Sequence, residues 1–251
     1  MGKFKFLKIS KNKKIRFLLK KNHSKICVVF LHGFMSDIEG KKPLTFAKFC
    51  SKKKINFLTL EYSGHGKSYG EFIKGNISKW TNDVSNTINV KIKNKNLIII
   101  GSSMGSWIAI NIILKLKNKI KGFIGISSAP EFLDILMWKK FSNKIKKKIL
   151  AEKIHHVEKD GLTYPITKQL IVDGKKNKVF NKKINLKIPV TLFHTKKDNV
   201  VPIYFSKKIL KIFPLAKKKL IIYKDGNHSL SRKKDLINIC RELDNIIQDL
   251  S

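Results

Sequence analysis

A serine flanked by glycines, in the motif GSSMG at residues 101–105, lies between an apolar run that predicts a strand and an apolar segment that predicts a helix. In a strand-to-helix turn of the G-x-S-x-G type, the glycines permit a strained backbone that exposes the central serine at the end of a sheet. This context predicts that Ser103 is a nucleophile. Ser102 is the rival hydroxyl, but only Ser103 is centred between the two glycines.

A nucleophilic serine in such a turn needs a carboxylate and a histidine, which follow it in that order along the chain. Asp198 lies in the loop after a later predicted strand, and His228 follows the last one. We expect Asp198 to be the acid that orients the imidazole and His228 to be the base. Glu131 and Asp134, which follow the preceding strand, are the alternative acids.

The segment FLHGF at residues 30–34 predicts an oxyanion loop after the third strand. We expect the backbone N–H groups of Phe34 and Met104 to hold the negative charge that develops on a carbonyl oxygen. His32 precedes the nucleophile, and its place in a histidine–glycine turn favours a role in bracing that loop. Asp225 shares the short loop of His228 and is interpreted as a turn residue.

Four further histidines are predicted to have structural or solvated positions. His65 belongs to a glycine-rich turn, which favours a structural role, whereas His23, His155 and His156 lie in lysine-rich segments and are expected to be solvated. No cluster of histidine, aspartate and glutamate has the spacing of metal ligands, so neither a metal nor another cofactor is expected.

The elements that must position these residues alternate along the chain. Short, almost continuous apolar runs predict strands that are buried on both faces of a parallel sheet. An alternating pattern at 3–9 and 14–19 predicts a leading antiparallel pair. Strand runs lie at 26–31, 55–61, 96–101, 120–127, 190–194 and 220–223, and helical spacing lies at about 43–52, opening at Pro43, and at 77–92, 104–116, 203–213 and 236–250. The pattern predicts an α/β protein with a mainly parallel, eight-stranded sheet.

The chain is expected to form one domain, 1–251, with a small, mostly helical cap inserted at about 131–187, because that interval is too long for a single crossover. An apolar stripe in the cap could line an acyl pocket or pack the cap on the sheet. A basic run at 144–148 is interpreted as a solvated face, or as cations suited to an anionic leaving group. The stripe comprises Phe132, Leu133, Met137, Trp138 and Phe141.

The composition limits the possible partners. The formal charge is +37, but only three of the 54 basic residues are arginine, whereas nucleic-acid readers favour arginine. We therefore expect no specific nucleic-acid binding and attribute the lysine excess to coding bias. No apolar stretch could span a membrane, no signal peptide is visible, and three widely spaced cysteines are typical of a cytoplasmic protein. The expected partner is a small-molecule or acyl-protein substrate, and the oligomeric state stays open.

The chain resembles the α/β-hydrolase superfamily, and within it the alpha/beta-hydrolase-domain-10 group, mitochondrial and bacterial serine esterases described as palmitoyl-protein thioesterases and acyl-glucuronide esterases. The resemblance covers nearly the whole chain and implies the α/β-hydrolase fold, with a triad on Ser103, Asp198 and His228. Ser106 stands where the group usually has glycine, which would crowd the turn. The resemblance rests on FLHGFMS at 30–36, YSGHGKS at 62–68, ISKW at 77–80, GSSMGSW at 101–107 and DGNHSLS at 225–231.

The residues and the resemblance together predict a serine hydrolase that cleaves a carboxylic ester or thioester through an acyl-enzyme. One alternative is a carbon–carbon bond hydrolase or perhydrolase that uses the same three residues. The other is a basic polyanion-binding protein on an inactive hydrolase scaffold.

Overall fold

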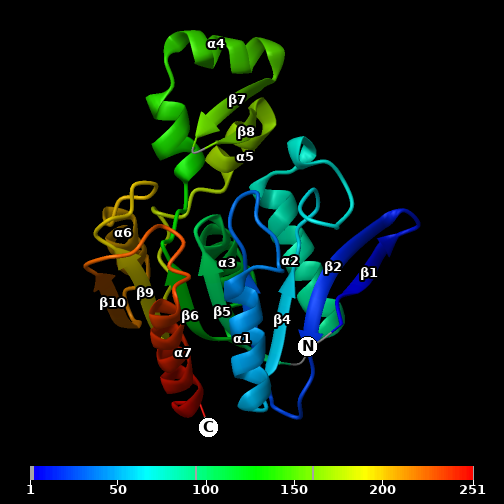
Figure 1. The fold of residues 1–251 in the computed structure, drawn as a ribbon, viewed down its shortest axis with the longest axis vertical. Helices are drawn as coiled ribbons and strands as arrows, with labels where there is room; N and C mark the ends of the chain where they lie inside the picture. The colour runs from blue at the N-terminus through cyan, green and yellow to red at the C-terminus, as the bar shows by residue number, and fades with distance from the viewer. Residues whose placement is uncertain (1–2, 94, 160, 251) are drawn as a thin grey trace.

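A computed structural model describes residues 3–93, 95–159 and 161–250. Its main sheet consists of β1 (Lys5–Ser10), β2 (Lys13–Lys20), β3 (Ile26–Leu31), β4 (Asn56–Leu60), β5 (Asn96–Ser102), β6 (Ile120–Ile126), β9 (Pro189–Thr195) and β10 (Lys217–Tyr223). The strands lie in the order β1-β2-β4-β3-β5-β6-β9-β10 (Figure 1). The β1–β2 and β2–β4 pairs are antiparallel, and all other neighbours in this sheet are parallel.

The predicted α/β class and the mainly parallel, eight-stranded sheet are therefore confirmed. Each predicted strand of the sheet exists, although β1 starts two residues later than expected, at Lys5, and β2 is one residue longer at each end. Strand β10 starts three residues earlier than expected, at Lys217. All six residues of β3 are buried, as expected for a strand that is covered on both faces.

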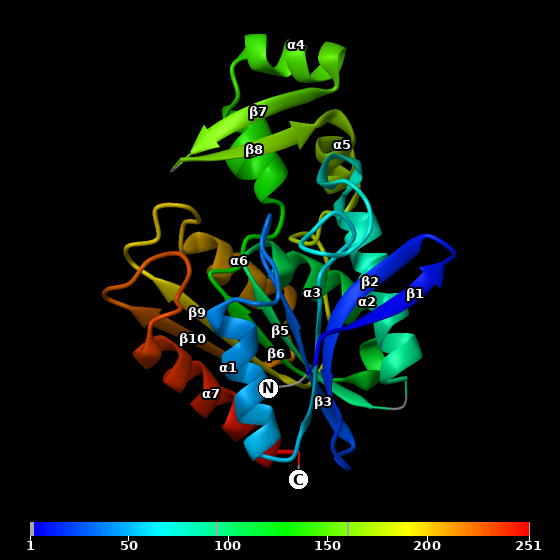
Figure 2. The same ribbon diagram turned by 45° about the vertical axis from the view of Figure 1, so that its right-hand side comes forward.

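Five long helices cover the sheet: α1 (Lys41–Lys52), α2 (Ile77–Lys91), α3 (Met104–Lys115), α6 (Tyr204–Ile212) and α7 (Lys233–Gln248), with short turns η1 (Phe72–Lys74) and η2 (Lys117–Lys119). Helices α1 and α7 lie on one face, where Phe46 and Leu236 join one buried cluster (Figure 2). Helices α2, α3 and α6 lie on the other, where Trp80, Trp107 and Phe205 join a second. The sheet thus separates two apolar cores.

The start of α1 differs from the prediction. The helix begins at Lys41, so Pro43 is its third residue and not its first. Proline is tolerated there because the first N–H groups of a helix have no acceptor within it.

The chain between β6 and β9 forms a cap that rises above the carboxyl ends of the central strands (Figure 1). It contains η3 (Leu133–Met137, one π-helical turn), η4 (Trp138–Lys140), α4 (Asn143–Glu152), β7 (Ile154–Lys159), β8 (Leu162–Thr167) and α5 (Lys168–Lys176). The expectation of a mostly helical cap missed the antiparallel pair of β7 and β8. Alternating Tyr164 and Ile166 suit a strand, and Gly161 adopts φ +73 in the turn.

Candidate active site

Ser103 lies in a tight turn between β5 and α3, with φ 53 and ψ −120. A Cβ atom on Gly101 would lie 2.5 Å from Ser106 Cα, and one on Gly105 would lie 2.1 Å from the carbonyl oxygen of Leu31. Larger residues at these two positions would push the helix away from the strands. The close packing that the glycines permit therefore holds Ser103 in its strained conformation.

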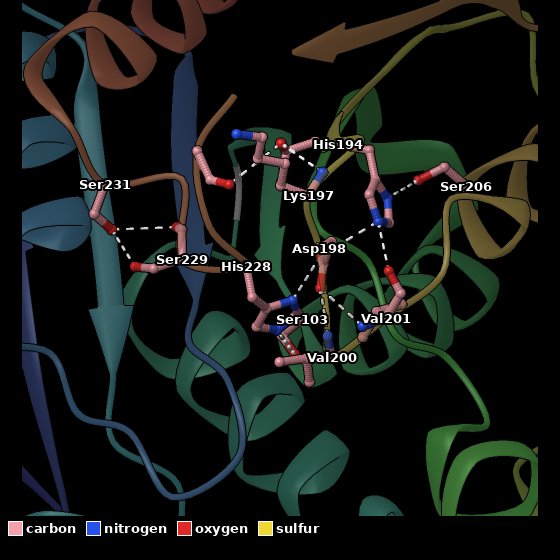
Figure 3. Close-up of polar contacts among 12 residues, drawn as sticks. Ser103, His194, Lys197, Asp198, Val200, Val201, Ser206, His228, Ser229 and Ser231 are labelled. Carbon is pink, nitrogen blue, oxygen red and sulfur yellow. Dashed lines mark hydrogen bonds and ion pairs between the residues drawn. The ribbon is translucent and has the colours of Figure 1, made fainter. Parts of the chain in front are cut away.

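The structure brings Ser103, His228 and Asp198 together from three loops at the carboxyl edge of the sheet (Figure 3). The Nε2 atom of His228 lies 3.0 Å from Ser103 Oγ, and its Nδ1 atom lies 2.8 Å from Asp198 Oδ2. Because a carboxylate accepts hydrogen bonds, the Nδ1–H group donates to Asp198. Nε2 is then free to accept the hydroxyl proton of Ser103.

Asp198 is held as a buried carboxylate, with only 1% of its side chain exposed. Its Oδ1 atom accepts the backbone N–H groups of Val200, at 2.9 Å, and Val201, at 2.8 Å. Burial alone would raise the pKa of Asp198, but hydrogen bonds from His194, His228 and the Val201 amide outweigh burial and hold the pKa well below its usual range. The carboxylate is therefore ionised at neutral pH.

His194, near the end of β9, is a site residue that the sequence analysis did not single out. Its buried Nε2 atom lies 2.8 Å from the carbonyl oxygen of Val201 and 3.3 Å from Asp198 Oδ2 (Figure 3). Since a carbonyl oxygen can only accept, Nε2 carries the proton, and Nδ1 accepts from Ser206 Oγ at 2.9 Å. The available signal was a histidine in an apolar strand, four residues before the predicted acid.

The alternative acids are engaged elsewhere. Glu131 Oε1 accepts the backbone N–H groups of Val179, at 2.8 Å, and Phe180, at 2.7 Å. Asp134 Oδ2 lies 3.4 Å from the ammonium of Lys178. Neither carboxylate contacts His228 within the described part of the chain. Ser102, the rival nucleophile, is buried at the end of β5, and the imidazole faces Ser103 instead.

The predicted oxyanion loop lies against the Ser103 turn, because a Cβ atom on Gly33 would lie 3.5 Å from Ser103 Cβ. Within residues 3–93, 95–159 and 161–250, neither the N–H group of Phe34 nor that of Met104 donates to a protein acceptor. Both donors are therefore available to a ligand at Ser103. The phenyl ring of Phe34 contacts the rings of Phe72, at 4.9 Å, and Phe132, at 5.4 Å.

His32 and His65 form a buried pair behind this loop, with ring centroids 5.1 Å apart. His32 Nδ1 lies 2.9 Å from the carbonyl oxygen of Gly33, and Tyr62 donates to the carbonyl oxygen of His32 at 2.9 Å. Burial lowers the pKa of His32 to about 4 and that of His65 to about 3, and His32 lowers the second further. The geometry suits the predicted structural roles of both residues.

Of the three histidines that were expected to be solvated, two are exposed. His23 and His156 are exposed, whereas His155 is half-buried, with its ring 6.1 Å from that of Phe141. Asp225 pairs with Arg232 Nη1 at 2.8 Å, within the turn that carries His228. Among the described residues, no three side chains of histidine, cysteine, aspartate or glutamate come together in a way that could hold a metal ion.

A cavity of about 810 Å³ opens at Ser103 and His228 between the sheet and the cap. Its cap side is mainly apolar, with Lys140 of η4 as a charged exception, and the opposite side, near the start of α1, is polar. The apolar wall contains Phe34, Phe132, Leu136, Met137, Phe141, Val157 and Tyr164, and the polar wall contains Ser36, Asp37, Lys42, Asn199, Ser229 and Ser231.

The predicted cap stripe divides between the two uses that the sequence left open. Phe132, Met137 and Phe141 line the cavity. Leu133 is fully buried in the core, and the ring of Trp138 packs 4.7 Å from the ammonium of Lys175. The stripe therefore both lines the cavity and packs the cap.

The structure supports the interpretation of the basic run as a solvated face, and the expectation for Ser106 needs correction. The lysines of 144–148 lie on α4 at the top of the cap (Figure 1) and do not line the cavity, because the cap turns its η3–η4 segment toward Ser103. Ser106 does not crowd the turn as expected. Its hydroxyl donates to the carbonyl oxygen of Gly101 at 2.7 Å and accepts from Ser128 at 2.8 Å.

Comparisons with known proteins place the chain in a family of hydrolases. The sequence family Hydrolase_4, described as serine aminopeptidase, S33, matches residues 22–163. The chain is 26% identical over 231 residues to the rat protein "Palmitoyl-protein thioesterase ABHD10, mitochondrial", covering 89% of this chain and 76% of the relative. The bovine protein of the same name is 25% identical over 228 residues, covering 89% and 74%.

Solved structures share the fold at lower identity. A putative hydrolase from Agrobacterium vitis S4 superposes with a TM-score of 0.90 at 24% identity, covering 98% of both chains. Mouse alpha/beta hydrolase domain-containing protein 10 gives a TM-score of 0.88 at 23% identity and covers both chains fully, at 100%.

Proposed function

The chain belongs to the Hydrolase_4 family and is an α/β-hydrolase, and from that premise we propose that it cleaves carboxylic esters or thioesters through an acyl-enzyme on Ser103. The observation that carries the proposal is the continuous chain of hydrogen bonds from Ser103 through His228 to Asp198. The name of the ABHD10 relatives, which describes them as thioesterases, supports the thioester part.

In the first step, Ser103 Oγ attacks the carbonyl carbon while His228 Nε2 takes the hydroxyl proton. The carbonyl oxygen becomes an oxyanion and accepts hydrogen bonds from the N–H groups of Phe34 and Met104. As the tetrahedral intermediate collapses, the bond to the leaving alkoxide or thiolate breaks, and His228 gives that group its proton. Asp198 stabilises the imidazolium that exists between these two transfers.

Water completes the cycle. It gives a proton to His228 Nε2 and attacks the acyl carbon, and the second intermediate releases the carboxylic acid and returns the proton to Ser103. Asp198 keeps Nδ1–H directed toward itself throughout, so that Nε2 always faces the reacting oxygen.

The two walls of the cavity suggest how a substrate lies. The acyl chain follows the apolar wall beneath the cap, beside Phe132 and Phe141, and the leaving group points toward the polar wall at the start of α1. A cytoplasmic location stays a prediction that rests on the three free cysteines.

The proposal is tested with a fluorophosphonate, which reacts with activated serines. The wild-type protein should be labelled on Ser103, and Ser103→Ala should abolish labelling and ester hydrolysis while the folded state persists by circular dichroism. The matched control is Ser102→Ala, which removes the neighbouring hydroxyl and should keep the label. Labelling of the Ser103→Ala protein, or none of the wild type, would contradict the assignment of the nucleophile.

A further inference from the structure

The loop that carries His228 starts from β10, which is the edge strand of the sheet and pairs only with β9 among the described strands. Arg232 closes the base of the loop through its ion pair with Asp225. The loop turns back at Leu230, whose φ is 44 and whose side chain is fully buried. These contacts hold the two ends of the loop and its buried side. The segment directly after His228 needs a separate anchor.

Lys42, in the first turn of α1, provides contacts of this kind from a helix 187 residues away in the chain. Its ammonium donates to the carbonyl oxygen of Ser229, to Ser229 Oγ at 3.2 Å and to Ser231 Oγ at 3.0 Å. The two serine hydroxyls also lie 2.6 Å from each other. Ser229 and Ser231 lie on one side of His228, with Asp198 on the other (Figure 3).

The three acceptors match the three N–H groups of an ammonium. All three N–H donors of the ammonium therefore bond the loop, and none is left to bond a ligand in the cavity. Burial lowers the pKa of Lys42 to about 8, while Asp235 raises it, so the side chain stays mainly protonated at pH 7. Helix α1 is fixed on the sheet by the buried side chains of Phe46 and Cys50, which gives this contact a rigid support.

We propose that Lys42 is a positioning residue for His228: it ties the loop of the catalytic base to α1 and so keeps Nε2 at hydrogen-bond distance from Ser103. The inference rests on the proposed function, because it concerns the same reaction. A displacement of a catalytic group by about 1 Å can lower a rate by about 100-fold. Loss of the contact should therefore slow the chemical step for every substrate.

The experiment compares Lys42→Met, Lys42→Arg and Lys48→Met in the full chain. Lys48 is an exposed lysine of the same helix with no hydrogen bond to the loop in the described residues, and serves as the charge-matched control. Two substrates with the same butyryl group are used, p-nitrophenyl butyrate and its analogue with a carboxylate on the ring. Each variant gives kcat, KM and the rate of fluorophosphonate labelling of Ser103.

Lys42→Met should lower kcat roughly 10- to 100-fold on both substrates, with KM within about twofold, and should slow labelling by a similar factor. Lys42→Arg should restore most of the rate, and Lys48→Met should behave as wild type. A higher KM for the carboxylated substrate alone, with kcat and labelling unchanged, would overturn the proposal and make Lys42 part of a leaving-group site. Unchanged kinetics on both substrates would also overturn it.

Two checks separate this inference from folding and from the proposed function. If Lys42→Met does not fold, the double variant Ser229→Ala with Ser231→Ala removes two acceptors and keeps the lysine, and should lower kcat and labelling in parallel by about 3- to 10-fold. Normal kinetics of that double variant would then overturn the proposal. If the wild-type protein is not labelled at all, the proposed function fails, whatever the variants do.

Discussion

Asp198 is unusual among the carboxylates of the site because two histidines donate to it, His228 from the reacting side and His194 from the interior. The second contact means that the orientation of the acid does not depend on His228 alone. His194 is itself held by hydrogen bonds with Val201 and Ser206, neither of which involves His228.

This arrangement predicts a clear order among the carboxylates. Asp198→Asn should lower kcat by about 10⁴, because the amide favours the wrong imidazole tautomer. Glu131→Gln and Asp134→Asn should each lower kcat by less than about 10-fold, because both groups face the cap. Steady-state kinetics of the three variants decide the question, and the reverse order would place the acid after β6.

The site residues differ in how close in the sequence the signals that predict them lie. Ser103 could be predicted because its glycines and flanking elements are its neighbours in the sequence. Asp198 and His228 followed from the order in which such residues leave successive strands. Lys42 carries no comparable mark, because its contacts join positions 187 residues apart, and one lysine among 51 gives no pattern.

At the scale of elements, the cap shapes the cavity beside Ser103 and His228. Its η3–η4 segment supplies the apolar wall of the cavity, while α4 points away. The apolar runs predicted the central strands closely, since strands such as β3 and β4 are buried along their whole length. The β7–β8 pair was not predicted, because it lies in the cap, where partial exposure interrupts the apolar pattern.

The apolar wall predicts a dependence on acyl chain length. Each buried CH₂ group contributes roughly 0.8 kcal/mol, or about fourfold in kcat/KM, until the cavity is full. The measurement is a series of p-nitrophenyl esters from acetyl to palmitoyl. Phe141→Ala should remove much of the gain for longer chains, and Trp138→Ala, which alters cap packing outside the cavity, should keep it. A flat wild-type profile would mean that the wall only packs the cap.

The His32–His65 pair joins the loops after β3 and β4 and makes stability depend on pH. Both histidines have lowered pKa values in the folded protein, so the unfolded chain binds protons more readily. The contribution of the two neutral histidines to stability is therefore fully present at pH values above the pKa of histidine in the unfolded chain, near 6.5. It is lost as the pH falls toward about 4. Urea titrations should give a free energy of unfolding lower by roughly 2 to 4 kcal/mol at pH 5 than at pH 7.

His65→Phe tests the cause of that loss. The new ring would lie among Phe72 and Trp80, whose centroids are each 5.0 Å from that of His65. The variant should lose about half of the pH dependence, whereas His156→Ala, at an exposed position, should keep all of it. Equal slopes for wild type and His65→Phe would assign the effect to other groups.

At the scale of the whole molecule, the contrast between lysine and arginine is informative. Only three arginines remain beside 51 lysines. Arg16 donates to Glu61 at 2.9 Å and pairs with Glu39 at 2.5 Å, and Arg232 pairs with Asp225 and Asp235. Both stand where one planar cation bridges two carboxylates, a task that lysine performs poorly. Arg16 and Arg232 therefore stand where the planar shape of arginine is used.

Arg16→Lys should consequently destabilise the fold. The side chains of Arg16 and Glu61 are 7% and 0% exposed, so an imperfect partner leaves a buried carboxylate poorly paired. We expect a loss of about 1 to 3 kcal/mol in the free energy of unfolding. The same substitution at exposed Arg241 should cost less than about 0.5 kcal/mol. Denaturant titration of both variants makes the comparison, and equal effects would contradict this view of the arginines.

The two outer strands give the lysine excess a physical effect on solubility. An edge strand exposes unpaired N–H and C=O groups, and an identical chain can add to them and start an aggregate. Here β1 carries exposed Lys5 and Lys8, and β10 begins with three exposed lysines, Lys217, Lys218 and Lys219. Pairing of two such edges would place rows of like charge side by side. The exposed lysines of β1 and β10 are therefore expected to oppose self-association at both edges of the sheet.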